Sequence, residues 1–92
     1  ELKDYILKIP IDTTDQFGNT SLHIAAQNNC VKITKLLLQH GANVNATNSK
    51  GDSALHYAYT YQYNKIINLL LTKNASTLAR NHNGRLPAQG VK

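Results

Sequence analysis

Sulfur-containing and aromatic residues are scarce in this sequence. Its 92 residues include no Trp, no Met, one Phe and one Cys. The lone Cys30 cannot form an intrachain disulfide, whereas secreted domains of this size usually depend on several. No apolar run approaches the roughly 18 residues that a transmembrane helix requires, and no signal peptide is recognisable. We therefore predict an intracellular, cytoplasmic protein without membrane insertion. Because the chain begins at Glu1 rather than Met, we expect a fragment of a longer protein.

Acidic residues are missing from the second half of the chain. Residues 1–52 carry five Lys and five acidic residues, whereas residues 53–92 carry no Asp or Glu. The net charge of +5 therefore lies entirely in the second half, on Lys65, Lys73, Arg80, Arg85 and Lys92. Such a field favours a partner with an acidic surface, although a solvated basic surface with no partner would show the same composition.

The residues that build catalytic and metal sites are equally scarce. His40 and His82 have no Cys, Asp or Glu at metal-ligand spacing. Asp52 is the one carboxylate after Asp15, so general acid–base catalysis lacks a pair of carboxylates. The glycines do not form a phosphate-binding loop, and we expect Cys30 to be a buried, inert thiol. We therefore predict that the chain is not an enzyme and binds no metal and no cofactor.

What the sequence does contain is an internal repeat. Gly18, Gly51 and Gly84 are equally spaced along the chain. A shift by this same interval aligns apolar residues and one His, in the pairs Leu22 with Leu55, His23 with His56, Ala25 with Ala58, Ile33 with Ile66, Leu37 with Leu70, Leu38 with Leu71 and Ala42 with Ala75. So many matches at one offset indicate an architecture of stacked repeats.

Each unit is predicted to form two short helices followed by a polar connector. The predicted helices cover residues 20–29, 31–39, 54–62 and 64–72. Thr20 offers a capping hydroxyl to the first helix. Gly41 and Asn74 end the second helix of each unit, because both residue types tolerate a left-handed backbone. The connectors, residues 43–50 and 76–83, are rich in turn-forming residues.

A unit of this length, about 33 residues, with two helices and a turn resembles the ankyrin repeat. The resemblance rests on the Thr-Ser-Leu-His pattern from Thr20, the Leu-Leu-Gln-His-Gly-Ala pattern from Leu37, and counterparts in later residues. It covers residues 15–89 and implies an all-α ankyrin-repeat solenoid of helix-turn-helix units with finger-like β-turn connectors. We expect one domain with a partial repeat (1–14), two complete repeats (15–47 and 48–80) and a truncated repeat (81–92). In the partial repeat, the residues expected to face the core or to end the helix are Leu2, Tyr5, Ile6, Leu7 and Pro10.

Four positions depart from the family pattern. Ser21 and Ala54 stand where the family prefers Pro at the first helical position. Gln62 stands where Gly is usual before the second helix, and Tyr59 fills a position that normally holds a small residue. Because repeat stacks need about three units and only two are complete here, we expect modest stability.

The resemblance implies a module that binds another protein, such as a scaffold or an adaptor. Members of the family contact partners through the connector tips and the exposed side of the first helices. His23 and His56 would then be structural, each bonding the neighbouring turn. Carried over to this sequence, the candidate partner-binding residues are Gln16, Phe17, Asn19, Gln27, Asn28, Ser49, Lys50, Asp52, Tyr59, Thr60, Tyr61, His82, Asn83 and Arg85.

Aromatic residues stand out among these candidates. Tyr57, Tyr59, Tyr61 and Tyr63 alternate in a segment that the repeat aligns with a helix. We expect Tyr57 and Tyr63 to be packed, and Tyr59 and Tyr61 to point toward the concave face. Core filling and a binding patch explain this cluster equally well. Phe17 lies at a solvent-facing turn, where it either contacts a partner or folds onto the neighbouring finger.

The sequence bears on two further functions and one modification. An alternative to a free-standing scaffold is a regulatory or docking domain of a larger enzyme, since ankyrin-like repeats are often attached to kinases, acyltransferases and acyl-CoA-binding domains. Nucleic-acid binding is not expected, because no Lys/Arg cluster accompanies the tyrosines and no recognition helix is present. Asn45 lies where Asn residues of ankyrin-like repeats are sometimes hydroxylated, and its sequence context permits this.

Overall fold

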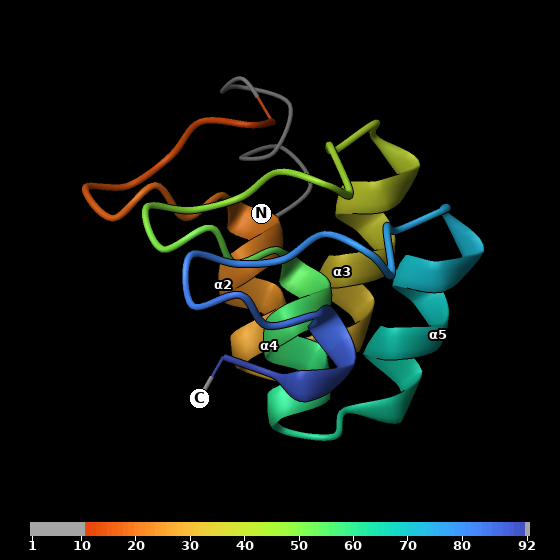
Figure 1. Cartoon of the computed structure of the whole chain (residues 1–92). Helices are drawn as coiled ribbons and strands as arrows, with labels where there is room; N and C mark the ends of the chain where they lie inside the picture. The colour runs from red at the N-terminus through yellow and green to blue at the C-terminus, as the bar shows by residue number, and fades with distance from the viewer. Residues whose placement is uncertain (1–10, 92) are drawn as a thin grey trace.

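Two pairs of helices, arranged as an inner and an outer layer, make up the fold. The computed structural model describes residues 11–91. Its helices are α2 (Ser21–Gln27), α3 (Val31–Gln39), α4 (Ala54–Thr60), α5 (Asn64–Thr72) and the short 3-10 helix η1 (Pro87–Gln89). The inner helices α2 and α4 pack on each other, as do the outer helices α3 and α5, and the connectors project from them as fingers (Figure 1). Residues 11–91 contain no strand, so the predicted all-α repeat architecture is confirmed.

Part of the sequence-based prediction falls outside the described residues. The expected contributions of the partial repeat come from Leu2, Tyr5, Ile6, Leu7 and Pro10, and all five lie before residue 11. The division into units at 15–47, 48–80 and 81–92 stays a prediction.

Reciprocal hydrogen bonds between a cap residue and a histidine begin each inner helix. The hydroxyl oxygens of Thr20 and Ser53 accept hydrogen bonds from the backbone N–H groups of His23 and His56. In return, the imidazole Nδ1 atoms accept from the backbone N–H groups of Thr20 and Ser53, each at 3.1 Å. These bonds satisfy N–H groups that a helix start leaves unpaired. The predicted capping role of Thr20 is therefore confirmed.

Left-handed residues separate the helices. The outer helices match their predicted bounds, and Gly41 (φ 86°) and Asn74 (φ 65°) follow them in the expected left-handed conformation. The inner helices end two residues earlier than predicted. The reason is that the chain already turns there, through the left-handed residues Asn29 (φ 54°) and Gln62 (φ 56°).

We expect Gln62→Gly to raise the free energy of unfolding by about 1 kcal/mol, because Gly adopts the left-handed backbone without strain. The Gln62 side chain is exposed, so its removal costs little packing. Urea denaturation would measure the gain. Asn29→Gly is the matched control and should gain less, since Asn tolerates this conformation. A loss of stability in Gln62→Gly would mean that added freedom of the unfolded chain outweighs the relieved strain.

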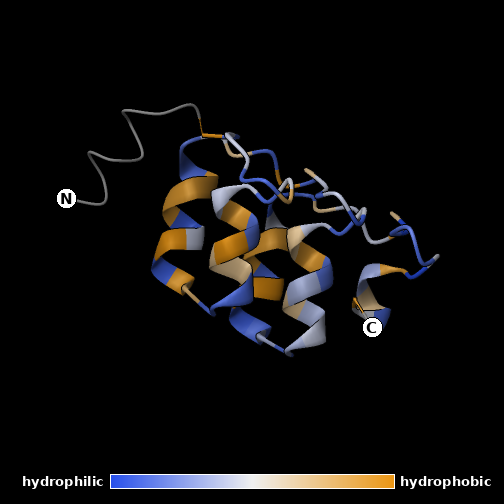
Figure 2. Ribbon diagram, turned by 90° about the vertical axis from the view of Figure 1, so that its left-hand side faces the viewer, coloured by the Kyte–Doolittle hydropathy of each residue, from blue (hydrophilic) through white to orange (hydrophobic). Residues whose placement is uncertain are grey.

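The core lies between the two layers and is built from residues that the repeat had aligned. Leu22, Leu37, Leu55, Ile66 and Leu70 are each exposed by 2% or less. Apolar segments run along the helices, whereas the fingers are mainly polar or neutral (Figure 2). The core therefore holds the helices together, and the fingers depend on hydrogen bonds.

One core position carries a hydroxyl without a partner. Thr34 of α3 is fully buried, and its Oγ1 atom makes no hydrogen bond. Thr34→Val keeps the shape and removes the unsatisfied group, so we expect the free energy of unfolding to rise by roughly 1 kcal/mol. Thermal or urea denaturation would test this. Thr72→Val is the control, because the exposed Thr72 hydroxyl donates to Asn68 O at 2.7 Å, and it should give no gain. A Thr34→Val variant that is less stable would contradict the prediction.

Candidate protein-binding surface

The first finger carries Phe17 at its tip, the second Lys50 and the third His82, and hydrogen bonds hold each finger in register with the next. The backbone N of Ser49 donates to Phe17 O, and the backbone N of His82 donates to Lys50 O, both at 3.0 Å. Side-chain hydrogen bonds also join each finger to the next. The Nδ2 atom of Asn48 donates to Asn19 Oδ1 at 2.9 Å, and that of Asn81 donates to Asp52 Oδ1 at 2.8 Å. The finger tips therefore form one connected row.

Each tip is shaped by a side chain that folds back on its own backbone. The Oδ1 atom of Asp15 accepts from the N–H groups of Phe17 and Asn19, both at 2.9 Å. Asn48 and Asn81, at the equivalent positions, accept in the same way from the two corresponding N–H groups of their fingers. Hydrogen bonds from Asn19 and Phe17 hold the pKa of Asp15 below its usual value. A turn of this kind fixes the direction in which the tip residues point.

The two repeat histidines connect the inner helices to the fingers. The Nε2 atom of His23 donates to Asp52 O at 2.8 Å, and that of His56 donates to Arg85 O at 3.0 Å. In both rings Nδ1 accepts from the cap residue, so the hydrogen of the neutral ring is on Nε2. Burial lowers the pKa of His23, which keeps it in this neutral form. The predicted structural role of both histidines is confirmed.

Large apolar side chains are exposed on the surface that the finger tips and inner helices share. We call this the concave surface; its apolar members are Phe17, Ile24 and Tyr61. Phe17 is 60% exposed, so it does not fold onto the neighbouring finger, and Tyr61 and Ile24 are 47% and 42% exposed. Tyr61 directly follows α4, one turn after Tyr57, which aligns with Ile24 of α2, so Ile24 and Tyr61 belong to equivalent faces of their units. Side chains of this kind are typical contact residues.

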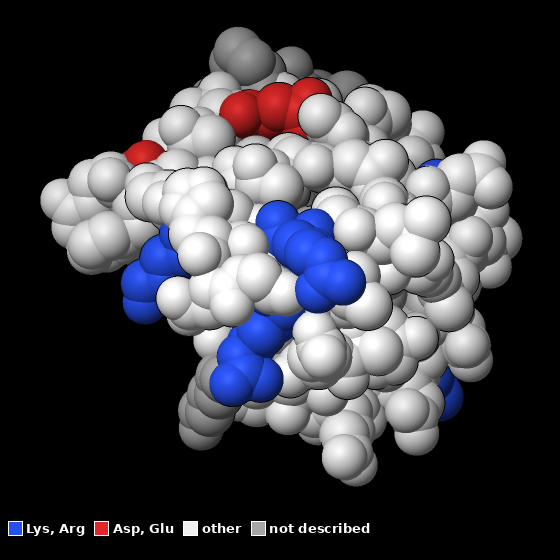
Figure 3. Space-filling view, viewed as in Figure 1, with Lys and Arg blue, Asp and Glu red and all other residues white. Residues whose placement is uncertain are grey.

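The charged side chains are unevenly distributed. Figure 3 shows Lys and Arg over the centre and lower part of the face seen there, with the acidic residues confined to its upper edge and left side. Of the described acidic residues, Asp12 and Asp15 are exposed and Asp52 is buried. Within residues 11–91, no three His, Cys, Asp or Glu residues gather as a metal site would require. No helix in that range is long and apolar enough to cross a bilayer.

Comparison with known proteins identifies the repeat. A family model described as ankyrin repeats, in three copies, matches residues 2–81. The chain belongs to the ankyrin repeat family. Its structure is similar to the crystal structure of the ankyrin repeat domain of Bcl-3, a member of the IkappaB protein family. The TM-score is 0.86 at 34% sequence identity, over 91% of this chain and 38% of that chain.

Curated relatives share shorter stretches with this ankyrin-repeat chain. It is 54% identical to palmitoyltransferase akr1 of Schizosaccharomyces pombe over a stretch of 39 residues. This stretch covers 42% of this chain and 6% of that protein. It is also 54% identical to protein fem-1 homolog A of Homo sapiens over a stretch of 37 residues. This stretch covers 40% of this chain and 6% of that protein. The chain thus matches only a small part of the length of these relatives. Ankyrin repeats are a type of protein-interaction module.

Most of the predicted partner-binding residues lie at the surface of this ankyrin-repeat structure. The exposed ones are Gln16, Phe17, Asn28, Ser49, Lys50, Tyr61, His82, Asn83 and Arg85, and the half-buried ones are Asn19, Gln27 and Thr60. The Thr60 hydroxyl is already engaged, since it donates to His56 O and accepts from the backbone N of Val91, both at 2.8 Å. Ile24 was missed by the sequence analysis, although its alignment with Tyr57 places it on the exposed side of an inner helix.

One predicted binding residue, Asp52, and the predicted burial of Cys30 need correction. Asp52 is only 2% exposed, because its carboxylate lies under the third finger and accepts from Asn81. It joins the fingers and is not accessible to a partner. Tyr59 is half-buried and packs against the core, and its role as a binding residue stays a prediction. Cys30 is half-buried rather than buried, because it lies at the start of α3, at the end of the helix layer.

The other tyrosines of the cluster agree with the prediction, since Tyr57 and Tyr63 are packed and Tyr61 is exposed. Tyr57 is partly buried, its hydroxyl accepts from Asn48 at 2.9 Å, and burial raises its pKa. Tyr63 packs against the core and stacks on Tyr61, with ring centroids 5.5 Å apart. Tyr61 is therefore an exposed ring held in place from one side, which limits the entropy that it would lose on contact.

Proposed function

We propose that this chain is a non-catalytic protein-interaction module, a scaffold or adaptor, that binds a partner protein through the concave surface. The observation that carries the proposal is that three of the five exposed large apolar residues, Phe17, Ile24 and Tyr61, belong to the first finger and the inner helices, while the core is well buried. Burying large rings and aliphatic side chains is the main source of binding energy in protein interfaces.

Cations beside these apolar residues favour an acidic partner surface. Lys50 and Arg85 are exposed on the second and third fingers, and Arg80 lies at the base of the third, where its Nη1 atom donates to Gly84 O at 2.6 Å. No exposed carboxylate lies on these two fingers. Charges of one sign around an apolar centre accelerate association with, and select, a partner of the opposite sign.

Affinity capture from cell extract tests the surface. The wild-type chain, the variant Phe17→Ala/Tyr61→Ala and the control variant Leu71→Ala/Leu78→Ala would be compared. Leu71 and Leu78 are also exposed apolar residues, but they lie outside the concave surface. We expect proteins retained by the wild type and the control to be lost from the Phe17/Tyr61 variant. If that variant retains the same proteins, the concave surface is not the binding surface.

A second candidate function is the regulatory or docking domain of a larger enzyme. It is favoured by the identity with part of a palmitoyltransferase, in which the matched stretch is 6% of the protein. The concave surface would then bind either another segment of the enzyme or its substrate protein. Determining the full-length coding sequence tests this. A catalytic domain in the same chain supports the docking function, and its absence leaves the scaffold function as the interpretation.

Asn45 is proposed as a site of hydroxylation. Its side chain is exposed, and its Oδ1 atom accepts from the backbone N of Ser76 at 2.8 Å. The residue therefore lies at the surface of a connector, where an enzyme has access after a local opening. Intact mass would be measured after incubation with an asparaginyl hydroxylase, beside Asn45→Ala. A gain of one oxygen atom in the wild type alone supports the proposal, and no gain contradicts it.

A further inference from the structure

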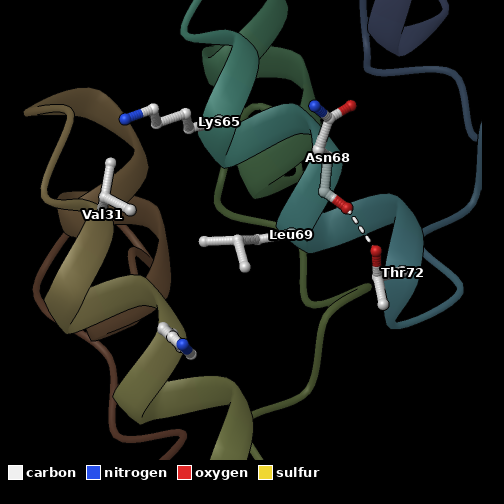
Figure 4. A pocket seen from close by; sticks show the side chains of 6 residues that line it. Val31, Lys65, Asn68, Leu69 and Thr72 are labelled. Atoms are coloured by element: carbon white, nitrogen blue, oxygen red, sulfur yellow. Dashed lines mark hydrogen bonds between the residues drawn. The ribbon is translucent and has the colours of Figure 1, made fainter.

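A small groove runs between the two outer helices, on the opposite side of the helix layers from the finger tips. It is lined by Val31 and Lys35 of α3 and by Lys65, Asn68, Leu69 and Thr72 of α5, and its volume is about 300 Å³. Figure 4 shows Leu69 pointing into the space between the helices and Lys65 extending from α5 toward Val31. The volume is at the lower end of the range for binding pockets, which suits one or two side chains of a peptide.

The two walls of the groove carry the same residue types in opposite order. The helices α3 and α5 run in the same direction (Figure 1). On α3, Lys35 lies one turn after Val31, whereas on α5, Lys65 lies one turn before Leu69. Four residues of helix advance about 6 Å. An apolar strip made by Val31 and Leu69 is therefore flanked by two ammonium groups, one on each wall, about one helical turn apart along the groove.

Within residues 11–91, the outer layer contains no acidic residue that could neutralise these cations. The sequences of α3 and α5 contain Lys32, Lys35 and Lys65 and no Asp or Glu, and Lys73 follows directly after α5. The exposed acidic residues of the described part, Asp12 and Asp15, precede α2. A groove with an apolar floor and uncompensated positive charge attracts an anionic segment that also carries apolar side chains.

We propose that this outer groove binds an acidic linear segment of a partner protein. The segment places an aliphatic side chain between Val31 and Leu69 and a carboxylate at each of Lys35 and Lys65. This combination uses both features of the groove, since burial of the aliphatic group supplies affinity and the two charges fix the direction of the segment.

A lipid surface fits the groove less well than a peptide does. Membrane association requires apolar side chains that protrude beyond the charged ones, and here Val31 and Leu69 are half-buried at the floor. The exposed large apolar residues are Phe17, Ile24, Tyr61, Leu71 and Leu78, and none of them lines the groove. Single-stranded nucleic acid is also disfavoured, because no aromatic residue in the groove could stack on a base.

The outer groove uses none of the residues of the concave surface, so the two proposals stand separately. The probe is a synthetic peptide in which leucines alternate with glutamates, titrated into the isotopically labelled full chain and followed by NMR. Two control peptides replace the glutamates by glutamine or the leucines by serine. We expect saturable shifts at Val31, Lys35, Lys65 and Leu69 with the first peptide, and weak or no shifts with the controls.

Charge-reversal variants locate the site. Lys35→Glu/Lys65→Glu removes both groove cations, whereas Lys32→Glu/Lys73→Glu makes the same change in net charge outside the groove lining. All four side chains are exposed, so both variants should fold. We expect roughly a tenfold loss of affinity in the first variant and less than about a twofold loss in the second.

Several outcomes would overturn the proposal. Equal losses in the two variants would show that net charge alone attracts the peptide. Shifts confined to Phe17, Ile24 and Tyr61 would assign the peptide to the concave surface, and an absence of saturable binding would leave the groove without this ligand. Co-sedimentation with phosphatidylserine vesicles, sensitive to Lys35→Glu/Lys65→Glu and accompanied by no peptide binding, would assign the groove to lipid.

Discussion

Gly51→Ala is expected to lower the free energy of unfolding by roughly 2–4 kcal/mol, through left-handed strain and a collision between fingers. Gly51 has a φ of 78°, and a Cβ atom added there would lie 2.6 Å from His82 Cδ2 and 3.0 Å from the backbone N of His82. The imidazole can rotate away. The backbone N is fixed by its hydrogen bond to Lys50 O, so the third finger must shift as a whole or lose this bond.

Gly84→Ala provides the matched control for this effect. Gly84 has nearly the same φ, 77°, but an added Cβ would meet no atom within 4 Å. Its replacement therefore carries left-handed strain alone, which costs about 1 kcal/mol. Urea denaturation followed by circular dichroism would compare the two variants with the wild type. Equal losses would show that the second and third fingers do not pack as closely as the structure indicates.

The constant interval between the copies made most of the helix pairs predictable. Residues that recur at this interval are those that bond or pack to the next unit. Gly51 touches the following finger, His23 and His56 reach the following finger, and Leu22 and Leu55 fill the core. A bond that each unit makes favours the same or a similar residue type in each copy. Repetition in the sequence therefore reports structural roles.

Several positions at which the copies differ reach solvent. The tip residues Phe17 and Lys50 align with each other, as do Asn28 and Tyr61, and all four are exposed. No neighbouring unit constrains these positions, so their residue types can match the surface of a partner. The sequence therefore predicts which positions of the repeat form the candidate site.

The remaining features of the site depend on contacts that one sequence does not reveal. Asp52 aligns with the half-buried Asn19, and only the position of Asn81 above it shows that its carboxylate is enclosed. The outer groove was not predicted either. It arises where Lys65 and Leu69 of one unit meet the preceding helix α3, and such a pairing requires the rotation of both helices to be known.

His23→Ala is expected to lower the free energy of unfolding by roughly 3 kcal/mol, because it leaves one buried backbone N–H without a partner, removes one of two hydrogen bonds to a buried carbonyl and empties a buried side-chain site. The N–H is that of Thr20, and the carbonyl is that of Asp52, which keeps the bond from the backbone N of Asn48 at 3.0 Å; Thr20 and Asp52 are 3% and 2% exposed. His23→Gln is a finer test. In the third unit, Gln89 Oε1 accepts from the backbone N of Leu86 at 2.6 Å, so Gln can replace the cap bond. It should lose only the link to Asp52, which we expect to cost about 1–2 kcal/mol.

The same pair of proteins tests the protonation state of His23. Its pKa in the folded chain is lowered from 6.5, chiefly by burial. Between the folded and unfolded pKa values the unfolded chain binds more protons, so the stability that neutral His23 provides is complete above pH 6.5 and is lost as the pH falls below it. We therefore expect the difference in unfolding free energy between wild type and His23→Gln to shrink from about pH 7.5 to about pH 5.5. The other histidines are common to both proteins, so this difference isolates His23. The Asp15 carboxylate, whose pKa lies below 3.8, titrates outside this range. A difference independent of pH would mean that His23 takes up its proton in the folded chain as readily as in the unfolded one, and that its ring does not hold the second finger as a neutral donor.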